Sequence, residues 1–513
     1  MKRVLALILA LVCMLASFTA MAEGKLISDE PVTLKLTVEE LSVAGASYAD
    51  NLPVFQAIEE RTGVKIEWEV IPAEYKTVMS TRLASLMDLP DIIAYSGNAS
   101  TVINSGAIIP LDELVAEHAP NLTAFLAANP DIAATLYGPD GKLWFLPGRT
   151  ISMEGLAFNP GTFIVRYDWM QKCGIEDYPE TIDDWYKLLT AFRTMDPNGN
   201  GEQDEEGYVN TASRITAFAS AWGIDWMNPY YVDDNGKVQY AWATEATYDF
   251  LSTMAKWYAE GLIAPDYLSV TNMDTRLPEN KAGSTFLNAS SNCGWHNDAN
   301  PNEGCDWRPV APPKNVYTGE DGFLPVNTGE RLGDYKMAVS STCVDPVVAV
   351  KWLDFMYSAE GLRFTNAGVE GVSYTVAEDG SLIYADEYFK GSSAYENRKK
   401  FGIEPSGTIP HQLMSDYFNG VGNEYPAMIL EMAKPMGQYF RAALPVYAPT
   451  EEEDAILSAV QTDITTYAEE MIHKFIIGTE SLEGYEDYVK KINAIGLSDV
   501  LAIKQAQYDR NNK

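Results

Sequence analysis

The sequence predicts an α/β protein with more than one lobe, and three observations lead to this fold class. The first is a strand, helix, strand unit near the start of the chain, over residues 32–70. The second is the length of 513 residues, which at roughly 100–200 residues per domain suits two or three domains, or two large lobes sharing one interrupted chain. The third is the composition, since 46% hydrophobic and 11% aromatic residues supply a large core and exclude disorder as a description of the whole chain.

The first lobe is predicted from alternation and from helix signals. Apolar and polar residues alternate from Val32 to Glu39, which is typical of a half-buried strand. A helix over 53–61 follows, Gly63 ends it, and a second alternating segment over 64–70 forms the next strand. Two such strands in one sheet need a right-handed crossover, so we expect a parallel sheet with helices on its faces. A helix over 75–87 and a short buried strand over 90–95 extend this lobe.

A second lobe is predicted to begin near Asn159, where the composition changes. Its clearest helix follows Thr181, which can cap it, with Asp184 in the first turn and apolar residues at the helical spacing 185, 188, 189 and 192. Another helix is predicted from Asp345 and Pro346 to a stop near 361. The chain ends in two helical segments, over about 452–475 and 485–506.

The first 22 residues are typical of a secretory signal peptide. Lys2 and Arg3 precede an apolar run over 4–18, and a small-residue cleavage site follows at 20–22. The apolar run has about 15 residues, whereas a membrane-spanning helix needs about 20. We therefore predict a cleaved signal over 1–22 and an exported protein, periplasmic or extracellular. Cell-surface association is left open, because Cys13 lacks the residues that precede a lipid-modified cysteine.

The charge balance excludes two classes of partner. The chain has 72 acidic and 37 basic residues, a formal net charge of −35. Nucleic acids and anionic membrane surfaces both require clustered Lys and Arg. We therefore expect neither partner.

Four cysteines remain after the signal segment: Cys173, Cys293, Cys305 and Cys343. Cys293 and Cys305 flank a loop rich in Asn, Gly and Pro, where closing a short ring is geometrically easy, and export permits disulfides. A bridge between them and a pair of buried thiols are both compatible with the sequence.

The segment 196–207 has the spacing of a calcium loop. Oxygen-bearing side chains occupy positions 1, 3, 5 and 9, the position-seven ligand can be a backbone carbonyl, and Gly199 and Gly201 permit tight turns. Position 12 is Gly207, so the closing carboxylate must come from Glu205 or Glu206, and we favour Glu205. A solvated acidic turn without metal is the alternative. The predicted ligand set is Asp196, Asn198, Asn200, Glu202, Asp204 and Glu205.

Catalytic signatures are absent from the sequence. It contains no nucleophile elbow, zinc-protease motif, phosphate loop or dinucleotide fingerprint, and its four histidines are scattered. Acidic pairs such as Asp183 and Asp184 could serve a glycosidase, but among 72 carboxylates such pairs arise by chance. We therefore predict a protein that is not an enzyme.

Aromatic residues near predicted loops suggest a sugar-binding surface. Sugar rings pack their C–H faces on indole and phenol rings, while their hydroxyl groups bond to amides and carboxylates. Trp222, Trp226, Trp295 and Tyr95, which is followed by Ser96, lie near expected loops or element ends. Each of them is also compatible with a place in the core.

The order of several short segments resembles the extracellular solute-binding proteins of ABC transporters, in particular the large type that includes alginate-binding and other oligosaccharide-binding members. The resemblance covers nearly the whole mature chain. Its carriers are the segments 55–67, 89–93, 106–114, 141–147, 165–170, the loop from Asp196, 261–266 and 507–510.

This resemblance implies a periplasmic-binding-protein fold (type II-like) with two α/β lobes joined by hinge strands. We expect 31–158 and 335–390 in lobe 1, and 159–334 and 391–513 in lobe 2. It further implies a monomer that captures a solute, expected to be an oligosaccharide, in the cleft between the lobes and delivers it to a membrane permease. It also implies structural calcium at the loop 196–207. From loops that follow strands we choose as ligand residues Tyr95, Ser96, Trp222, Trp226, Trp295, Glu370 and Tyr374.

Two alternatives remain at this point. One is a secreted polysaccharide-degrading enzyme, which the carboxylates and aromatic residues would suit. The other is a surface sensing or adhesion module that uses the same cleft without transport. The sequence identifies neither the ligand nor its affinity.

Overall fold

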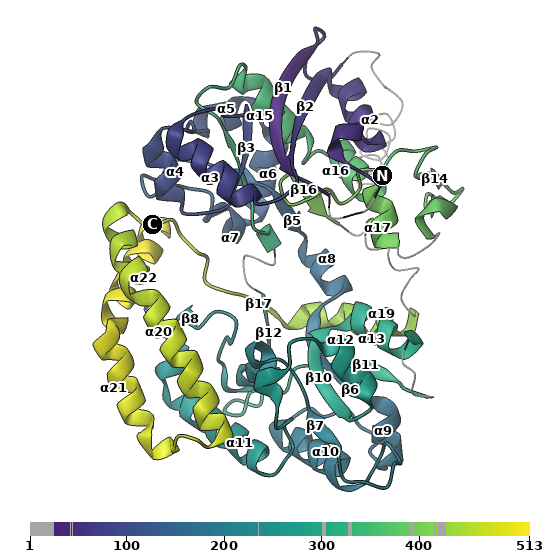
Figure 1. Cartoon of the computed structure of the whole chain (residues 1–513), viewed down its shortest axis with the longest axis vertical. Helices are drawn as coiled ribbons and strands as arrows, with labels where there is room; N and C mark the ends of the chain where they lie inside the picture. Colours follow the sequence, from purple (N-terminus) through teal and green to yellow (C-terminus); the bar gives the residue numbers. More distant parts are fainter. Residues whose placement is uncertain are drawn as a thin grey trace, which may run out of the picture.

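The computed structural model describes residues 25–41, 43, 45–233, 235–299, 304–326, 331–389, 394–414, 417 and 427–512. The predicted signal peptide over 1–22 lies outside the described residues. The described chain forms two lobes, one above the other in Figure 1, with the C-terminal helices along one side. The prediction of a two-lobed α/β fold is confirmed.

The first lobe is built on a mixed sheet with the strand order β2-β1-β3-β13-β4. Strand β1 (Val32–Glu39) pairs in parallel with β2 (Val64–Ile71) and with β3 (Ile92–Tyr95). Strand β13 (Lys336–Val339) returns from much later in the chain and pairs antiparallel with β3 and with β4 (Leu146–Pro147). The predicted parallel unit therefore exists, and an antiparallel strand completes it.

The helices between these strands begin and end where local chemistry places them. Helix α2 (Pro53–Thr62) starts with Pro53, whose missing N–H is not needed there, and ends at Gly63 in the left-handed conformation with φ 76°. A Cβ at Gly63 would lie 2.0 Å from the Ser28 carbonyl oxygen, so only glycine fits this end. Helix α3 (Tyr75–Ser85) then leads to β3.

The second lobe carries a smaller sheet with the order β11-β6-β10-β7. Strand β6 (Gly161–Arg166) lies between β11 (Trp307–Val310) and β10 (Ala282–Asn288), both antiparallel to it, and β7 (Glu206–Tyr208) pairs in parallel with β10. This sheet positions helix α9 (Tyr167–Lys172), α10 (Ile182–Thr194), the 3-10 helix η2 (Ala212–Trp222) and α11 (Glu245–Ala259).

Several predicted helices are present with their caps. Helix α10 begins with the capping box of Thr181 and Asp184. Helix α15 (Pro346–Phe355) is capped by Asp345, and α16 (Ala359–Ala367) follows it after a short break, past the predicted stop at 361. The C-terminal segments form α20 (Glu451–Ile477), α21 (Tyr485–Ile495) and α22 (Leu497–Asn511).

Each lobe has its own hydrophobic core. Buried residues from Leu34 to Leu146 and from Leu332 to Tyr417 form the first, and those from Phe163 to Leu324 and from Ile429 to Val500 form the second. Our expected boundary at 391 is therefore too early, because Ile403 and Leu413 pack in the first core. The reason is that β16 (His411–Leu413) pairs with β5 (Arg149–Ile151), which precedes the crossing to the second lobe.

The chain crosses between the lobes more than once. Helix α8 (Met153–Phe158) stands in the first crossing, between β5 and β6 (Figure 1). Strands β12 (Leu324–Val326) and β17 (Phe440–Ala442) pair in parallel in the second lobe, close to two further crossings of the chain. After β17 the chain runs to α20, and the Ser100 hydroxyl of the first lobe donates a hydrogen bond to the Pro449 carbonyl on this segment. Nowhere in the described ranges is a helix both long and apolar enough to cross a membrane.

Candidate functional site

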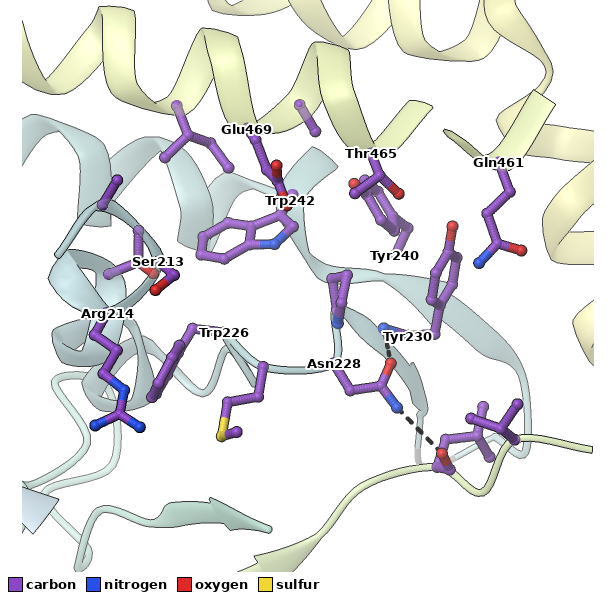
Figure 2. A pocket seen from close by; sticks show the side chains of 18 of the residues that line it. Ser213, Arg214, Trp226, Asn228, Tyr230, Tyr240, Trp242, Gln461, Thr465 and Glu469 are labelled. Atoms are coloured by element: carbon purple, nitrogen blue, oxygen red, sulfur yellow. Dashed lines mark hydrogen bonds between the residues drawn. The ribbon is translucent and has the colours of Figure 1, made fainter. Parts of the chain in front are cut away.

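A cavity of about 830 Å³ lies in the second lobe, beneath helix α20 (Figure 2). Its walls come from the start of η2, the turn that follows η2, the hairpin of β8 (Tyr230–Val232) and β9 (Val238–Tyr240), the C-terminal helices and the segment that returns from β17 toward the first lobe. In Figure 1, β8 lies on the side of the second lobe that faces the first. The volume falls within the range of about 300–1,000 Å³ that is usual for small-molecule sites.

A tight turn presents Trp226 to this cavity. Helix η2 ends at Gly223, and the Asp225 carboxylate then accepts hydrogen bonds from the backbone N–H groups of Met227, at 3.0 Å, and Asn228, at 2.9 Å. The turn leaves Trp226 in the cavity wall, packed edge-on against Phe286 at 5.4 Å between ring centroids. The indole N–H of Trp226 is buried, and no described residue accepts a hydrogen bond from it.

Aromatic side chains from the β8–β9 hairpin continue the wall. The rings of Tyr230 and Tyr240 lie 5.1 Å apart, and Trp242 follows them in the short helix η3 (Ala241–Ala243). Burial raises the pKa of Tyr230 to about 12, so its hydroxyl group stays protonated at neutral pH. That hydroxyl is buried without a hydrogen-bond partner among the described residues. It is available to a guest molecule.

The opposite wall is a row of polar side chains on one face of α20. Gln461, Thr465, Glu469 and His473 are spaced four residues apart, so they project in one line along the helix, as Figure 2 shows for the first three. The His473 Nδ1 lies 3.0 Å from the Tyr267 hydroxyl, and burial lowers the pKa of His473, which keeps the imidazole neutral. Helix α22 adds Lys504, whose ammonium lies 4.4 Å from the centre of the Tyr230 ring.

The returning segment closes the cavity near its opening. Leu444, Pro445 and Val446 line it, and the Asn228 amide donates a hydrogen bond of 3.1 Å to the Leu444 carbonyl. Asn228 also accepts a bond of 3.3 Å from the Tyr230 backbone N–H, so one amide ties the hairpin to the segment (Figure 2).

This arrangement suits a ring that has apolar faces and polar edges. Indole and phenol rings offer flat surfaces on one side, and amide, hydroxyl and carboxylate groups face them from α20. Glu469 is the one carboxylate among the described lining residues. Hydrolysis of a glycosidic bond commonly requires two carboxyl groups flanking that bond. The described lining therefore matches binding better than hydrolysis.

A second hollow of about 1,070 Å³ lies on another side of the same lobe, between the loop 175–180 and the residues around Met436. Three of its charged lining side chains are already paired. Lys187 pairs with Asp184 at 3.0 Å, and Lys314 pairs with Glu180 at 2.5 Å. We therefore regard the cavity beneath α20 as the better candidate site.

Of the seven predicted ligand residues, the structure brings Trp226 to the cavity and leaves the others elsewhere. Trp222 is buried in the core against Phe250, with ring centroids 5.5 Å apart. Tyr95 stacks on Phe145 in the first lobe, and its hydroxyl donates to the Asn98 carbonyl at 2.7 Å; Ser96 follows it directly after β3.

The remaining three predicted ligand residues lie far from one another in the sequence and outside the cavity lining. Trp295 is 49% exposed on α13 (Ala289–Ala299). Glu370 is exposed and Tyr374 is buried at the start of β14 (Tyr374–Val376), in the first lobe. The sequence reasoning favoured loops after strands, whereas the cavity is made by a hairpin and a C-terminal helix. The four-residue spacing of polar side chains in α20 is the signal that could have revealed it.

The predicted calcium loop folds into a compact turn rich in oxygen atoms. The Asp196 carboxylate accepts hydrogen bonds from the backbone N–H groups of Gly199, Asn200 and Gly201 at 2.9 to 3.1 Å. The amide groups of Asn198 and Asn200 both point at Asp204 Oδ1, at 3.1 and 3.0 Å. Side chains from positions 1, 3, 5 and 9 of the loop therefore converge.

Glu205 supplies the feature that points to a cation. Its side chain is completely buried, and its Oε2 atom has no hydrogen-bond partner among the described residues. Burial, with Asp196 and Asp204 nearby, raises the pKa of the Glu205 carboxyl. A buried carboxylate oxygen without a partner is unfavourable unless a cation or a proton neutralises it. The donor set of carboxylate and amide oxygens is the set that Ca²⁺ prefers. The donor types are those of a calcium site, but no group of three or more acidic, His or Cys side chains among the described residues is placed to hold a metal ion, and Asn198 and Asn200 turn amide nitrogens toward Asp204.

Cys293 and Cys305 carry free thiols in this structure, as do Cys173 and Cys343. Burial raises the pKa of the Cys293 thiol well above its ordinary value. The sequence was compatible with either a disulfide between Cys293 and Cys305 or two thiols, and the structure has two thiols.

Comparison with known proteins shows which protein family and which characterised proteins this chain resembles. A sequence model described as bacterial extracellular solute-binding protein matches residues 45–362. The fructooligosaccharide ABC transporter substrate-binding protein FusA of Streptococcus pneumoniae serotype 4 is 25% identical over 94% of this chain and 91% of FusA.

Solved structures share the fold over nearly the whole chain. The alginate-binding protein AlgQ2, in a crystal structure without calcium ion, has a TM-score of 0.68 at 23% identity and covers 95% of this chain and 100% of its own. An EF-hand mutant of FusA in complex with fructo-nystose has a TM-score of 0.67 at 21% identity, with coverage of 93% and 99%. At these identities the likeness shows the fold alone.

Proposed function

Because the chain belongs to the bacterial extracellular solute-binding proteins, we propose that it captures an oligosaccharide in the cavity beneath α20 and delivers it to the permease of an ABC importer. FusA is such a substrate-binding protein for fructooligosaccharides, and AlgQ2 binds alginate. The observation that carries the proposal is the pairing of an aromatic wall, in which two buried polar groups lack partners, with a row of polar side chains on α20.

The chemistry of capture follows from these groups. A sugar ring packs its C–H face on Trp226, while its hydroxyl groups bond to the Trp226 N–H, the Tyr230 hydroxyl and the polar side chains of α20. Such bonds recover the free energy that these buried groups lose when they have no partner. No bond in the sugar is made or broken. We propose that the protein is a binding protein and not an enzyme.

Export and a structural cation complete the proposal. The segment over 1–22 directs export of the chain from the cytoplasm. The chain then acts outside the cell, as the description of its family says. Ca²⁺ binds the loop from Asp196 to Glu205, where Glu205 supplies the closing carboxylate and the metal supplies charge neutralisation. The loop lies next to β7 and outside the cavity lining, so the ion stabilises the fold and takes no part in sugar binding.

Calorimetric titration with a panel of neutral and acidic oligosaccharides tests capture, using the secreted chain with calcium present. We expect one site per chain, and Trp226→Ala should weaken binding by about tenfold or more because it removes the stacking surface. Trp295→Ala is the matched control, since Trp295 is a half-exposed tryptophan outside the cavity lining.

The same mixtures decide between capture and hydrolysis. We expect recovered sugars of unchanged length and no new reducing ends after prolonged incubation. Release of reducing ends that depends on Glu469 would instead support a degrading enzyme. Binding without any interaction with a permease would favour a sensing or adhesion module.

A further inference from the structure

The cavity beneath α20 is lined by two positively charged side chains that have no carboxylate partner. The lining includes Arg214 and Lys504 as cations and Glu469 as an anion, while His473 is held neutral by burial. The described residues offer Arg214 and Lys504 no ion pair and no acceptor for a side-chain hydrogen bond. In a chain with 72 acidic and 37 basic residues, two unpaired cations in one cavity are unexpected by chance.

Lys504 is the more informative of the two. It projects from α22 to the face of the Tyr230 ring, and its ammonium lies 4.4 Å from the ring centre. Burial lowers the pKa of Lys504, which means that the protein environment disfavours its charge. A cation–π contact compensates for part of this cost, but an opposite charge compensates for much more.

Arg214 stands at the other end of the cavity. Figure 2 shows its guanidinium beside the Trp226 indole, whereas Tyr230 and Gln461 mark the far end, where Lys504 lies. Glu469 lies on α20 between these ends. A guest with two negative charges at its ends and hydroxyl groups in the middle would match this order, because Glu469 can accept hydrogen bonds from hydroxyl groups and would repel a central carboxylate.

We propose that the cavity selects an acidic oligosaccharide, built from uronic acid residues, whose carboxylates bind Lys504 at one end and Arg214 at the other. This inference rests on the proposed function and specifies the substrate class of the same site. The relatives leave the charge of the sugar undecided, because fructooligosaccharides are neutral and alginate is anionic. Charge-assisted hydrogen bonds from an ammonium and a guanidinium to carboxylates are stronger than bonds between neutral groups.

The test compares uronic acid dimers, which carry two carboxylates, with their fully methyl-esterified counterparts, which keep the hydroxyl groups but carry no charge. We expect the wild-type chain to bind at least one diuronate about tenfold or more tightly than its ester, measured by calorimetry at neutral pH. Raising the salt concentration should weaken binding of the acid more than binding of the ester.

Two variants locate the charges. Lys504→Met and Arg214→Met should each weaken binding of the acid by about tenfold and weaken binding of the ester by clearly less. Lys490→Met is the control, because Lys490 is an exposed lysine of the neighbouring helix α21 outside the cavity. Thermal unfolding checks that each variant is folded. If one is not, the remaining variant and the salt dependence of the wild type carry the test.

The outcomes separate this inference from the proposed function. If a neutral oligosaccharide or the ester binds as tightly as the acid, and Trp226→Ala abolishes that binding, the charge selection is wrong and the proposed function stands. If the acid binds more tightly but both methionine variants keep the preference, the assigned residues are wrong. If no oligosaccharide of either kind binds, both proposals fail.

Discussion

Two tryptophans four residues apart have different roles in this lobe, although both were predicted from the sequence to bind the ligand. Trp222 is 6% exposed and packs against Phe250, whereas Trp226 lines the cavity. Trp222→Ala should therefore lower the free energy of unfolding by about 3–5 kcal/mol, because it opens a void in the core. Trp226→Ala should lower it by much less. Urea unfolding of both variants and the wild type measures the difference. Equal losses of unfolding free energy would show that Trp226 is a core residue.

A buried histidine in the first lobe makes the stability depend on pH. His411 is completely buried in β16 and donates from Nδ1 to the Ile409 carbonyl at 2.9 Å. Burial, with Arg149 nearby, lowers its pKa from 6.5 to about 3. The folded chain therefore holds His411 neutral, and its contribution to stability is complete above pH 6.5 and is lost as the pH falls from there toward 3.

The slope of this loss can be measured. Each pH unit below 6.5 should cost about 1.4 kcal/mol for one such histidine, so unfolding at pH 5 should be easier by about 2 kcal/mol from His411 alone. His411→Gln should remove that part of the slope between pH 7 and 5 in urea titrations. His118→Gln on helix α5 (Asp112–His118) is the control, because His118 is partly exposed. An unchanged slope in His411→Gln would show that His411 is protonated in the folded chain.

Of the ligand residues predicted from the sequence, Trp226 lines the cavity and the others do not, and the reason is physical. Trp226 lies where a helix meets a turn, which local patterns can indicate. Its neighbours in the cavity come from residues 230–242 and 461–504, which meet because α20 packs on α11. No local pattern contains that contact. Trp222 lies at the end of η2, near a loop as expected, but its side chain packs inward against Phe250.

At the scale of single elements, the loop from Asp196 is the part whose behaviour should change most with its ligand. An ion that binds only the folded chain stabilises it by mass action, by about 2.7 kcal/mol at a concentration 100 times the dissociation constant. A chelator should therefore lower the melting temperature by several degrees, and added Ca²⁺ should restore it.

Glu205→Gln removes the closing charge and should abolish this response, because the amide cannot neutralise the ion. Asp233→Asn is the matched control. Asp233 also accepts backbone hydrogen bonds in a tight acidic turn, from Asn235 and Lys237 at 2.9 Å, but the Asp233 side chain is not buried. A full chelator response in Glu205→Gln would place the ion elsewhere.

One lysine beside the loop should tune its affinity. Lys281 pairs with Asp204 at 2.9 Å, so a positive charge stands next to the predicted ion. Lys281→Met should tighten calcium binding, because it removes both the repulsion and a competitor for Asp204. Titration with a calcium-sensitive chelator measures the change. Weaker binding in this variant would mean that Lys281 holds Asp204 in the geometry the ion needs.

The elements themselves were the most predictable part of the chain. Capping residues and hydrophobic spacing located α10, α15 and α20 because these signals are local. Strand β16 was missed, since its partner β5 lies about 260 residues earlier in the chain. That pairing places 403–417 in the first core and moves the second-lobe boundary beyond our expected 391.

At the scale of the whole molecule, two cores joined by crossing segments allow the lobes to move relative to each other. The cavity belongs to the second lobe, but its edge at Leu444 to Val446 continues to Pro449, which is held by Ser100 of the first lobe. A guest in the cavity therefore lies beside a segment that links the lobes. A ligand that binds the closed arrangement more tightly shifts the population toward it.

We accordingly expect a saturating oligosaccharide to reduce the radius of gyration measured by small-angle X-ray scattering. A pair of fluorescent labels, one at Lys142 on the first lobe and one at Glu260 on the second, should report a change in separation with the same midpoint as calorimetric binding. Trp226→Ala should move that midpoint to higher ligand concentration without changing the end states, because it weakens binding and leaves both lobes intact. Binding with unchanged scattering and label separation would show that the chain captures its guest as a rigid body, and a permease would then have to recognise the guest or the cavity edge directly.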